Sequence, residues 1–368
     1  MFELTIEKNK LLPSLMTVAG AVDKRQSLAI LANILLHLTD NRLVLTATDL
    51  EIEMSAYLNC ASSESTGKIT VQARKFIDII RSLDEETNVT VQLLSGSVAI
   101  KSGRSQFKLA SLPAEQFPVS DLDKSDTEFS INRNDLIHLF QSTHFAMSQQ
   151  DVRIFLNGLL LEINGHTLTA VATDGHRMAI CKSQCHESLG EYRFLLPRKG
   201  VQEMLRLLNN IADELITVTA GKGHFRLVTE HYTFSTKLIE ARFPPYAKAI
   251  PTDHDKFVLI DRDHLKRALS RIVILANEKS RAVLIHLQPN SLTLIANNQE
   301  QEEATELLEA NVDGNELKIG INASYLLDVL TFFPDGLVRL SMSTTDRSIL
   351  VESLQDENYQ YIIMPMKI

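Results

Sequence analysis

Three related stretches of the sequence decide the fold, and they are LANILLHLTDNRLVLTATDLEIEM (31–54), FLNGLLLEINGHTLTAVATDGHRMAI (155–180) and RAVLIHLQPNSLTLIANNQEQEEA (281–304). In each, a run of alternating apolar and polar residues is followed by a turn, a second alternating run and a polar corner. This pattern predicts two antiparallel strands joined in a hairpin. The corners contain Asp49, Asp174 and Asn298, which are spaced by 125 and 124 residues. The chain is therefore predicted to contain three tandem copies of one module.

The segments on both sides of each hairpin repeat in the same order. Upstream lie LTIEKNKLLPSLMTVAGAV, FSINRNDLIHLFQSTHFAM and FVLIDRDHLKRALSRIVIL, and downstream lie ITVQARKFIDIIRSL, RFLLPRKGVQEMLRLL and LKIGINASYLLDVLTFF. Each segment reads as a short strand followed by a helix. Polar stretches that read as linkers follow two Phe-Pro pairs. We therefore expect an α+β fold of three similar domains, 1–125, 126–253 and 254–368, each with two helices packed on antiparallel sheets.

The composition excludes several classes of protein. The chain has 368 residues, of which 44% are hydrophobic, and a formal net charge of −9. This charge rules out a generally basic nucleic-acid coat protein, but it leaves room for a local basic surface. The N-terminus lacks the basic head and apolar run of a secretory signal, and no apolar stretch approaches the roughly 20 residues that span a bilayer. The odd, sparse set of Cys60, Cys181 and Cys185 favours a reducing cytoplasm, and no membrane partner is expected.

Basic residues recur on the second predicted helix of the first two modules. Arg74 and Arg81 are seven residues apart and share a helix face, and Lys199 and Arg206 occupy the equivalent places of the second module. For a single helix the plain interpretation is a solvated face. On related helices, such residues favour a positive surface that binds phosphates without reading bases. In the third module the position equivalent to Lys199 is occupied by the uncharged Ala323, so the positive surface is expected to be uneven.

No catalytic motif is complete in the sequence, which contains no P-loop, HExxH or GxSxG pattern. Cys181, Cys185 and His186 resemble part of a metal site, but a fourth ligand is not evident, so neither a metal nor a cofactor is expected. The stretch Thr173-Asp174-Gly175-His176-Arg177 permits two interpretations. It is either the Asp174–His176 pair of an enzyme such as a phosphoester hydrolase, or a hairpin corner. The equivalent stretch Thr48-Asp49-Leu50-Glu51, which has no histidine, favours the corner.

Several motifs taken together resemble one known family. They are ATDLEIEM, SGRSQF, QDVR-x-x-LNG, VATDGHR, PRKG, ANNQEQEEA and the C-terminal MPMKI, and with the three modules they cover essentially the whole chain. This combination is similar to the bacterial DNA polymerase III beta subunit, the sliding-clamp family. The resemblance implies a DNA-clamp fold and a non-catalytic processivity factor of DNA replication. Two copies would join head to tail as a homodimer ring around duplex DNA, with helices lining the hole.

The resemblance also implies a seam between the two copies, in which a basic edge of the first domain meets an acidic edge of the third. The residues at the matching positions are Arg104, Phe107, Leu109, Ile274, Leu275, Glu300, Glu302, Glu303 and Glu306. Such an arrangement would cover sheet edges that are otherwise exposed. The plain alternative for the acidic run is a solvated face.

A second implied site is a pocket for short peptide motifs of the replicative polymerase alpha subunit, the clamp loader, other polymerases and repair proteins. Its matching positions are Leu156, Thr173, Gly175, His176, Arg177, Met178, Pro244, Ile362, Met364 and Met366, with Arg153, Phe155, Lys248, Asn322, Tyr325, Ser348 and Pro365 beside them. Methionine in an apolar cleft suits several partner peptides, because its side chain repacks easily. The rim residues Ile154, Phe155, Lys248 and Ala249 depart from the family pattern.

Duplex DNA is the remaining implied partner, and it would be bound without regard to sequence. The matching positions are Arg25 and Gln150, together with Lys24, Arg74, Lys75, Arg198 and Lys199. Contacts with phosphates are expected to be few and bridged by water, because a tether that slides cannot hold phosphates tightly. Binding of duplex by the free protein should therefore be weak and sensitive to salt.

Overall fold

The computed structural model describes residues 2–23, 28–39, 41–60, 65–120, 127–185 and 187–367. The chain divides into two compact units. Unit 1 comprises Met1–Asn134 and Lys199–Leu238, and unit 2 comprises Asp135–Arg198 and Ile239–Ile368. The middle module therefore contributes to both units, whereas the first module lies in unit 1 and the last module lies in unit 2.

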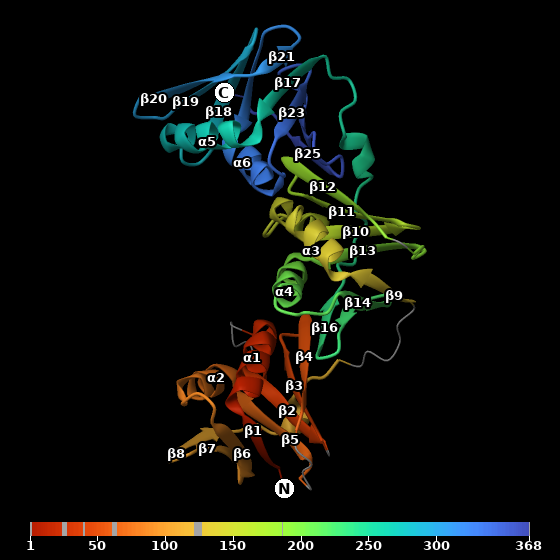
Figure 1. Ribbon diagram of the computed structural model, residues 1–368, viewed down its shortest axis with the longest axis vertical. Coiled ribbons are helices and arrows are strands. Elements are labelled where there is room, and N and C mark those ends of the chain that lie inside the picture. The colour runs from red at the N-terminus through yellow and green to blue at the C-terminus, as the bar shows by residue number, and fades with distance from the viewer. Residues whose placement is uncertain are drawn as a thin grey trace. The chain divides into compact units, whose positions relative to one another are not determined.

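The same order of elements occurs three times along the chain (Figure 1). The first module contains β1 (Glu3–Glu7), α1 (Lys8–Val18), β2 (Asn33–Thr39), β3 (Arg42–Thr48), β4 (Ile52–Asn59), β5 (Gly67–Gln72), α2 (Ala73–Ser82), β6 (Asn88–Leu94), β7 (Ser97–Ser102) and β8 (Ser105–Ala110). The second contains β9 (Thr127–Asn132), α3 (Arg133–Gln141), β10 (Gly158–Asn164), β11 (Thr167–Thr173), β12 (Arg177–Gln184), β13 (Glu191–Pro197), α4 (Arg198–Leu208), β14 (Leu215–Ala220), β15 (His224–Val228) and β16 (Tyr232–Lys237). The third contains β17 (Lys256–Asp261), α5 (Arg262–Ile272), β18 (Ala282–Gln288), β19 (Ser291–Asn297), β20 (Glu303–Glu309), β21 (Asn311–Asp313), β22 (Leu317–Asn322), α6 (Ala323–Phe332), β23 (Leu337–Met342), β24 (Ile349–Ser353) and β25 (Tyr359–Ile363).

Every predicted hairpin is present and antiparallel. In β10–β11 the last pair is Asn164 with Thr167, and in β18–β19 it is Gln288 with Ser291, so each loop has two residues. The equivalent pair of β2–β3 is Thr39 with Arg42. In β18 burial alternates, as the period of two predicts, whereas β2 and β10 each begin with four consecutive buried residues, which are covered on both faces. The α+β class and the threefold repeat are confirmed.

Each unit holds one long sheet that crosses a module boundary. In unit 1 the order is β5-β2-β3-β4-β16-β15-β14-β9, and in unit 2 it is β13-β10-β11-β12-β25-β24-β23-β17-β21. The β4–β16 pairing, here called the first junction, joins the first and second modules. The β12–β25 pairing, the second junction, joins the second and third. Each unit also has a four-stranded sheet, β1-β6-β7-β8 in unit 1 and β20-β19-β18-β22 in unit 2.

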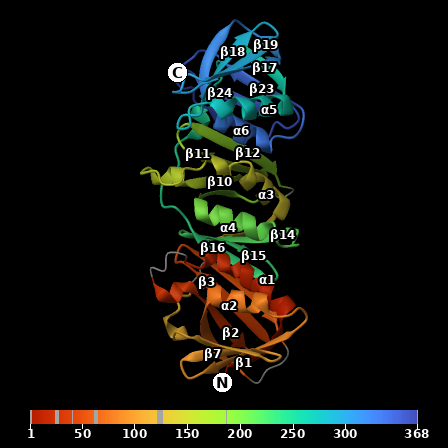
Figure 2. The ribbon, with the colours of Figure 1, turned by 90° about the vertical axis from the view of Figure 1, so that its left-hand side faces the viewer.

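The helices of the first and third modules pack in pairs. α1 lies beside α2, and α5 lies beside α6, as two views at right angles show (Figure 1, Figure 2). α2 buries Ala73, Phe76, Ile77 and Ile80, and this helical spacing places them on one face toward the sheets. Among the described residues, no helix is both long and apolar enough to cross a membrane.

One partly buried contact shows that the duplication extends to single side chains. The first helix of every module starts with a cation, and this cation binds backbone carbonyls at or just beyond the end of the second helix. Lys8 Nζ donates to Leu83 O, Arg133 Nη1 donates to Ile211 O, and Arg262 Nη1 donates to Phe333 O, each at 2.6 Å. A cation is favourable there, because the last carbonyls of a helix carry partial negative charge and lack partners within the helix.

Candidate functional site

The nine-stranded sheet of unit 2 carries an apolar cavity of about 420 Å³ at the second junction. Twelve of the residues that the sequence predicted for the peptide pocket line it, namely Arg153, Phe155, Leu156, Thr173, Gly175, His176, Arg177, Met178, Pro244, Ser348, Ile362 and Met364. The predicted residues Lys248, Asn322, Tyr325, Pro365 and Met366 are not among its lining residues. Ala249, which was expected at the rim, is a lining residue, and sequence reasoning missed three others, which are Phe243, Pro245 and Tyr246.

The floor of this pocket is a hydrophobic cluster shared by two modules. Met178 of β12 lies directly opposite Ile362 of β25, so the strand pairing itself brings the two modules' side chains together. Leu160, Val171 and Leu350 belong to the same buried cluster, which Phe155 and Tyr246 cover in part. A wall of fixed, apolar side chains suits an apolar ligand, because its binding removes further apolar surface from water.

The corner at Thr173-Asp174 shapes one side of the pocket. Asp174 Oδ1 accepts hydrogen bonds from the backbone N–H groups of His176 and Arg177 at 2.9 and 3.0 Å. In the first module Asp49 Oδ1 likewise accepts two N–H groups, those of Glu51 and Ile52, both at 2.9 Å. This Asx turn exists without histidine in the first module, so the stretch is a structural corner, as the repeat predicted.

Gly175 is favoured at this corner for two reasons. Its φ of +89° lies in the left-handed region, which glycine adopts at no steric cost. A Cβ atom here would also stand 3.2 Å from Arg153 Nη2, which is tight for a carbon. The equivalent Leu50 has a φ of +76°, so the repeat preserves the backbone shape while the side chain differs.

Arg177 connects the pocket to the helix side of the second junction. Its side chain is only 12% exposed and donates from Nε to Asp174 Oδ2 at 3.1 Å, and from Nη1 to Asp328 Oδ2 of α6 at 2.5 Å. Nη2 donates to Phe145 O at 2.8 Å, and the guanidinium lies 4.5 Å from the Tyr325 ring centroid. Tyr325 thus supports Arg177 from behind rather than lining the pocket.

These contacts leave no catalytic pair at the corner. Asp174 binds backbone N–H groups through one oxygen and Arg177 through the other, and its carboxylate has no hydrogen bond to the His176 ring among the described residues. The second chemical hypothesis, a zinc site at Cys181 and Cys185, involves His186, which lies outside the described residues. Within the described ranges no three His, Cys, Asp or Glu side chains cluster for a metal. Burial raises the pKa of the Cys181 thiol to about 12.

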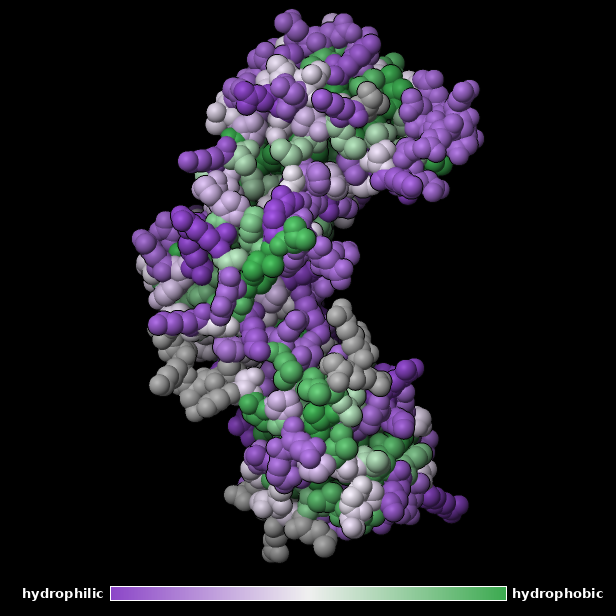
Figure 3. Space-filling view, turned by 180° about the vertical axis from the view of Figure 1, so that it is seen from behind, coloured by the Kyte–Doolittle hydropathy of each residue, from purple (hydrophilic) through white to green (hydrophobic). Residues whose placement is uncertain are grey.

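The pocket rim is partly exposed. Arg153 forms two hydrogen bonds with Asp151, at 3.0 and 2.9 Å, and these bonds lower the pKa of the Asp151 carboxyl to about 2. Val152, Ile154 and Met364 are 97%, 53% and 49% exposed. Seen from the side opposite to Figure 1, hydrophobic residues form patches within a largely hydrophilic surface (Figure 3).

The predicted DNA contacts fall into three groups. Lys24 and Arg25 lie outside the described residues. Arg74, Lys75 and Gln150 are exposed, the first two on α2. The last two predicted cations bind their own chain: Arg198 Nη1 donates to Met147 O at 2.7 Å, and Lys199 forms an ion pair with Asp49. Burial lowers the pKa of Arg198.

Arg206, which was predicted to share a phosphate-facing surface with Lys199, also has partners within unit 1. It donates to Thr17 O at 2.5 Å and to Met16 O at 3.2 Å, at the end of α1, and pairs with Glu203. The basic pair on α4 therefore closes the first junction. Whether Lys199 also meets DNA stays a prediction, and α2 is the helix of unit 1 that presents its basic pair to solvent.

The predicted seam residues lie at two sheet edges, one in each unit. β8 is the edge strand of its four-stranded sheet and contains Phe107 and Leu109, with Arg104 just before it. β20 is the edge strand of the other four-stranded sheet and contains Glu303 and Glu306. Each is an edge whose backbone groups could pair with another strand.

Beside β20, the predicted residues Ile274, Glu300 and Glu302 line a cavity of about 360 Å³, whereas Leu275 lies next to them in η7 (Val273–Leu275). Ile274 is 75% exposed. Glu306 accepts two hydrogen bonds from Arg271, at 2.6 and 2.9 Å, so its charge is partly neutralised within the unit. Sequence reasoning missed Leu307 of β20, which is 69% exposed, although the alternation of this strand points to it.

Comparison with known proteins assigns each module to a family. The N-terminal, central and C-terminal domain models of the DNA polymerase III beta subunit match residues 2–121, 130–245 and 247–367. The beta sliding clamp of Vibrio cholerae is 40% identical over 366 residues, covering 100% of both chains. That of Pseudomonas aeruginosa is 41% identical over 365 residues, covering 99% of both.

Solved structures agree with these matches. The DNA polymerase III subunit beta of P. aeruginosa is 40% identical with a TM-score of 0.96, covering 100% of both chains. The sliding clamp of the same organism bound to griselimycin gives a TM-score of 0.95 at 40% identity, covering 100% of this chain and 99% of that chain. The Caulobacter crescentus clamp gives 0.95 at 33% identity, covering 100% of both. The chain belongs to the DNA polymerase III beta subunit family, the bacterial sliding clamps.

Proposed function

We propose that this chain, as a sliding clamp, attaches its protein partners through the pocket of unit 2. The clamp is a non-catalytic processivity factor: it encircles duplex DNA as a homodimer and tethers the replicative polymerase. One observation carries the assignment of the pocket. An apolar cavity of about 420 Å³ is built from separate stretches of two modules that share a single sheet, and most of it is preformed in the free chain.

The domains are proposed to span 1–125, 126–253 and 254–368, and the cytoplasm is the proposed location. The two boundaries fall in the chain that links β8 to β9 and β16 to β17. Both junctions then lie between domains rather than inside one. A partner peptide seated at Met178 and Ile362 would contact the central and the C-terminal domain together.

The two junctions also indicate how two copies would meet. In each, the strand that follows a corner pairs antiparallel with the last strand of the next module, β4 with β16 and β12 with β25. The third module's equivalent strand is β20, whose edge is open within unit 2, and the remaining last strand is β8. We therefore propose that β20 pairs with β8 of a second copy. Arg104 on one side and Glu303 on the other would favour this register and speed encounter.

The seam is tested by the mass of the native species. We expect a dimer of the 41.3 kDa chain for the unmodified protein and a shift toward monomer for Glu302→Lys with Glu303→Lys. A matched double reversal at the exposed Glu86 and Glu115 of unit 1 should leave the mass unchanged. A protein that is monomeric at micromolar concentration without any substitution contradicts the ring.

Duplex DNA would be held mainly by the exposed Arg74 and Lys75 of α2, since Arg198 and Lys199 already have partners. Few cations facing phosphates allow the protein to slide and make binding sensitive to salt. Substituting both α2 residues by alanine should therefore reduce loading on DNA and leave peptide binding intact.

Two equally exposed methionines provide the sharpest test of the pocket. Met364 lines it and is 49% exposed, whereas Met16 of α1 is 48% exposed and belongs to unit 1. We expect Met364→Ala to weaken binding of labelled griselimycin about tenfold, in the range of a truncated apolar anchor, and to reduce stimulation of a polymerase. Met16→Ala should change neither. Equal affinity of Met364→Ala and the unmodified protein would refute the assignment, provided that both remain dimeric.

A further inference from the structure

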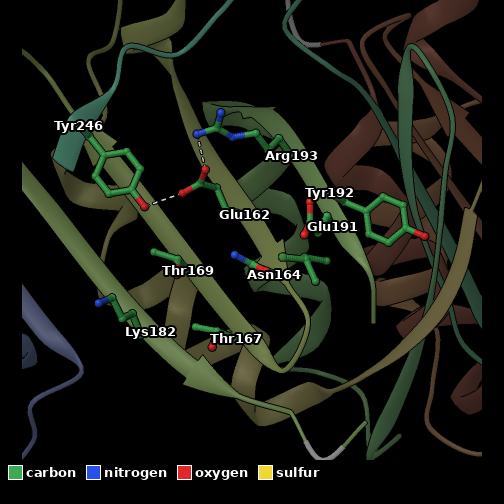
Figure 4. A pocket seen from close by; sticks show the side chains of 10 residues that line it. Glu162, Asn164, Thr167, Thr169, Lys182, Glu191, Tyr192, Arg193 and Tyr246 are labelled. Atoms are coloured by element: carbon green, nitrogen blue, oxygen red, sulfur yellow. Dashed lines mark hydrogen bonds and ion pairs between the residues drawn. The ribbon is translucent and has the colours of Figure 1, made fainter. Parts of the chain in front are cut away.

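A second cavity lies beside the pocket, on the nine-stranded sheet of unit 2. Its volume is about 590 Å³, and it is lined by residues of β10, β11, β12 and β13 together with Tyr246. Figure 4 shows Tyr246 at one end and Tyr192 at the other, with polar side chains on the strands between them. The term polar groove is used below for this cavity.

The strand register places the pocket and the polar groove on one face of the sheet. Residues directly opposite in paired strands project from the same side. One row across β13, β10, β11 and β12 is Leu195, Leu160, Val171 and Ile180, all buried beneath the pocket wall. The next row, two residues along, is Arg193, Glu162, Thr169 and Lys182. The face thus changes from apolar to polar within one repeat of the strand, about 7 Å.

Tyr246 is the wall that the two cavities share. Its ring packs edge-on against Phe243 of the pocket, with centroids 6.5 Å apart. Its hydroxyl donates to Glu162 Oε2 at 2.5 Å, and Arg193 pairs with the other oxygen of the same carboxylate. Burial and the neighbouring Glu162 raise the pKa of Tyr246, so the hydroxyl remains a donor at neutral pH. A chain leaving the pocket over Tyr246 would therefore enter the polar groove.

The row nearest the pocket contains two cations and one carboxylate, and the carboxylate is already used. Glu162 binds Arg193 and Tyr246. The Arg193 side chain is 64% exposed and so keeps donors that face solvent. Lys182 is exposed, and its ammonium group has no partner among the described residues. Glu191, the only other acid lining the groove in the described part of the chain, lies one row further from the pocket.

We propose that the polar groove extends the peptide pocket and binds an acidic residue in the polar flank of the same partner segment whose apolar end occupies the pocket. This inference rests on the proposed function of the pocket. Lys182 and Arg193 form the charge-complementary side, and Tyr246 is the step between the two parts. Partners that share similar apolar residues would then be distinguished by the charge of their flanks. An acidic flank would be attracted by the two cations of the groove and raise affinity, whereas a basic flank would be repelled.

The test uses the full-length dimer and three labelled synthetic peptides. In the first set, each peptide ends in the same Leu-Phe pair, which is preceded by a four-residue flank that contains two aspartates, two serines or two lysines. In a second set of three peptides, the same flanks follow the Leu-Phe pair instead. For one of the two sets we expect the aspartate peptide to bind about fivefold tighter than the serine peptide at low salt. Raising the salt to about 0.5 M should remove most of this difference, since both partners are exposed.

Variants of the groove separate its effect from that of the pocket. Lys182→Glu should reverse the preference, so that the lysine peptide binds tighter, and should leave affinity for the serine peptide within twofold. A control substitution at another exposed lysine of the same unit, Lys318→Glu on β22, should retain the aspartate preference. If all peptides bind the unmodified protein equally, or if Lys182→Glu weakens all of them alike, the groove has no such role. If no peptide binds, the pocket assignment fails as well.

Discussion

The two junctions of this chain use the same strand pairing but are closed by different side chains. At the first junction, Lys199 pairs with Asp49, and Arg206 binds the carbonyls of Met16 and Thr17 at the end of α1. These are charged contacts between a helix and its neighbours, and the Lys199 side chain is 42% exposed. They fix α4 against the first module.

The second junction is closed by aromatic residues around one arginine. Phe145 stacks on Phe332 with ring centroids 5.0 Å apart, and Tyr361 lies 5.2 Å from Phe333. The buried Tyr361 hydroxyl donates to Ser142 O at 2.6 Å. Arg177 lies in this group and reaches α6 through Asp328. These aromatic contacts hold the two modules together on the helix side of the β12–β25 pairing, so the opposite face of the two strands can carry the pocket.

The difference shows how one copy of a repeated module can acquire a site at its junction. Both corners keep the Asx turn of Asp49 and Asp174. At the first junction the corner carboxylate is used for closure, through Lys199, whereas at the second it holds Arg177, whose neighbours line the pocket. The repeat therefore supplies the scaffold, and the residues around each corner supply the function.

The largest expected effect distinguishes the two closures. Arg177→Ala should lower the free energy of unfolding of unit 2 by about 3 kcal/mol, because it leaves the largely buried Asp174, together with Asp328 and the partly buried Phe145 carbonyl, without their partner. Lys199→Ala should lower that of unit 1 by no more than about 1 kcal/mol, since the lysine is partly solvated and Asp49 keeps its two backbone N–H hydrogen bonds. Unfolding in urea can be monitored by hydrogen exchange of single backbone amides. The amide of Ile362 reports the unfolding of unit 2, and the amide of Phe234 reports that of unit 1. Equal losses in both variants would contradict the comparison.

A smaller effect concerns acid at the second junction. Burial lowers the folded-state pKa of His144 below its ordinary value of 6.5, and the charge of Arg198 lowers this pKa further. Hydrogen bonds to Phe140 O and Gln141 O oppose the shift but do not cancel it. The unfolded chain then binds more protons, so the free energy of unfolding of unit 2 should fall as the pH drops below about 6.5. His144→Gln should flatten this decline between pH 7 and 5, as measured by urea midpoints. An unchanged slope would show that His144 is not responsible.

The smallest predicted effect is a pH dependence of stability at the first junction, and its sign is opposite to that of His144. Burial raises the pKa of Glu53 of β4 above its ordinary value of 4.5, in spite of the hydrogen bond from Ser120 N–H at 2.9 Å. The folded state then binds more protons, so this contribution is present at low pH and is lost as the pH rises through the folded-state pKa. Compared with Glu53→Gln, the unmodified protein should lose stability in unit 1 between pH 4 and 7. A difference that does not vary with pH excludes this role.

The strands, hairpins and corners could be predicted from the sequence because they depend on local patterns. The alternation of apolar and polar residues identified the strands. The corner was recognised because Asp49 and Asp174 occupy the same place in two modules. The Tyr246–Glu162 hydrogen bond could not be predicted, since it joins residues 84 apart and depends on how the chain after β16 crosses the sheet. For this reason Phe243 and Pro245 were missed as well.

The basic helix faces show a further limit of sequence reasoning. Lys199 and Arg206 occupy the same places as Arg74 and Arg81, and a helical repeat alone assigns all four to one surface. In the structure the α4 pair binds α1 and the Asp49 corner, whereas Arg74 is exposed on α2. Equivalent sequence positions thus have different partners, because each helix meets a different neighbour.

Topological retention on DNA tests the central claim most directly. The protein should be loaded onto a nicked circular plasmid with a clamp loader and ATP, and then washed in high salt during gel filtration. We predict that it stays with the circle and is released when a single restriction cut makes the plasmid linear. Loss from the circle in high salt, or equal retention after the cut, would contradict a closed ring that slides on duplex DNA.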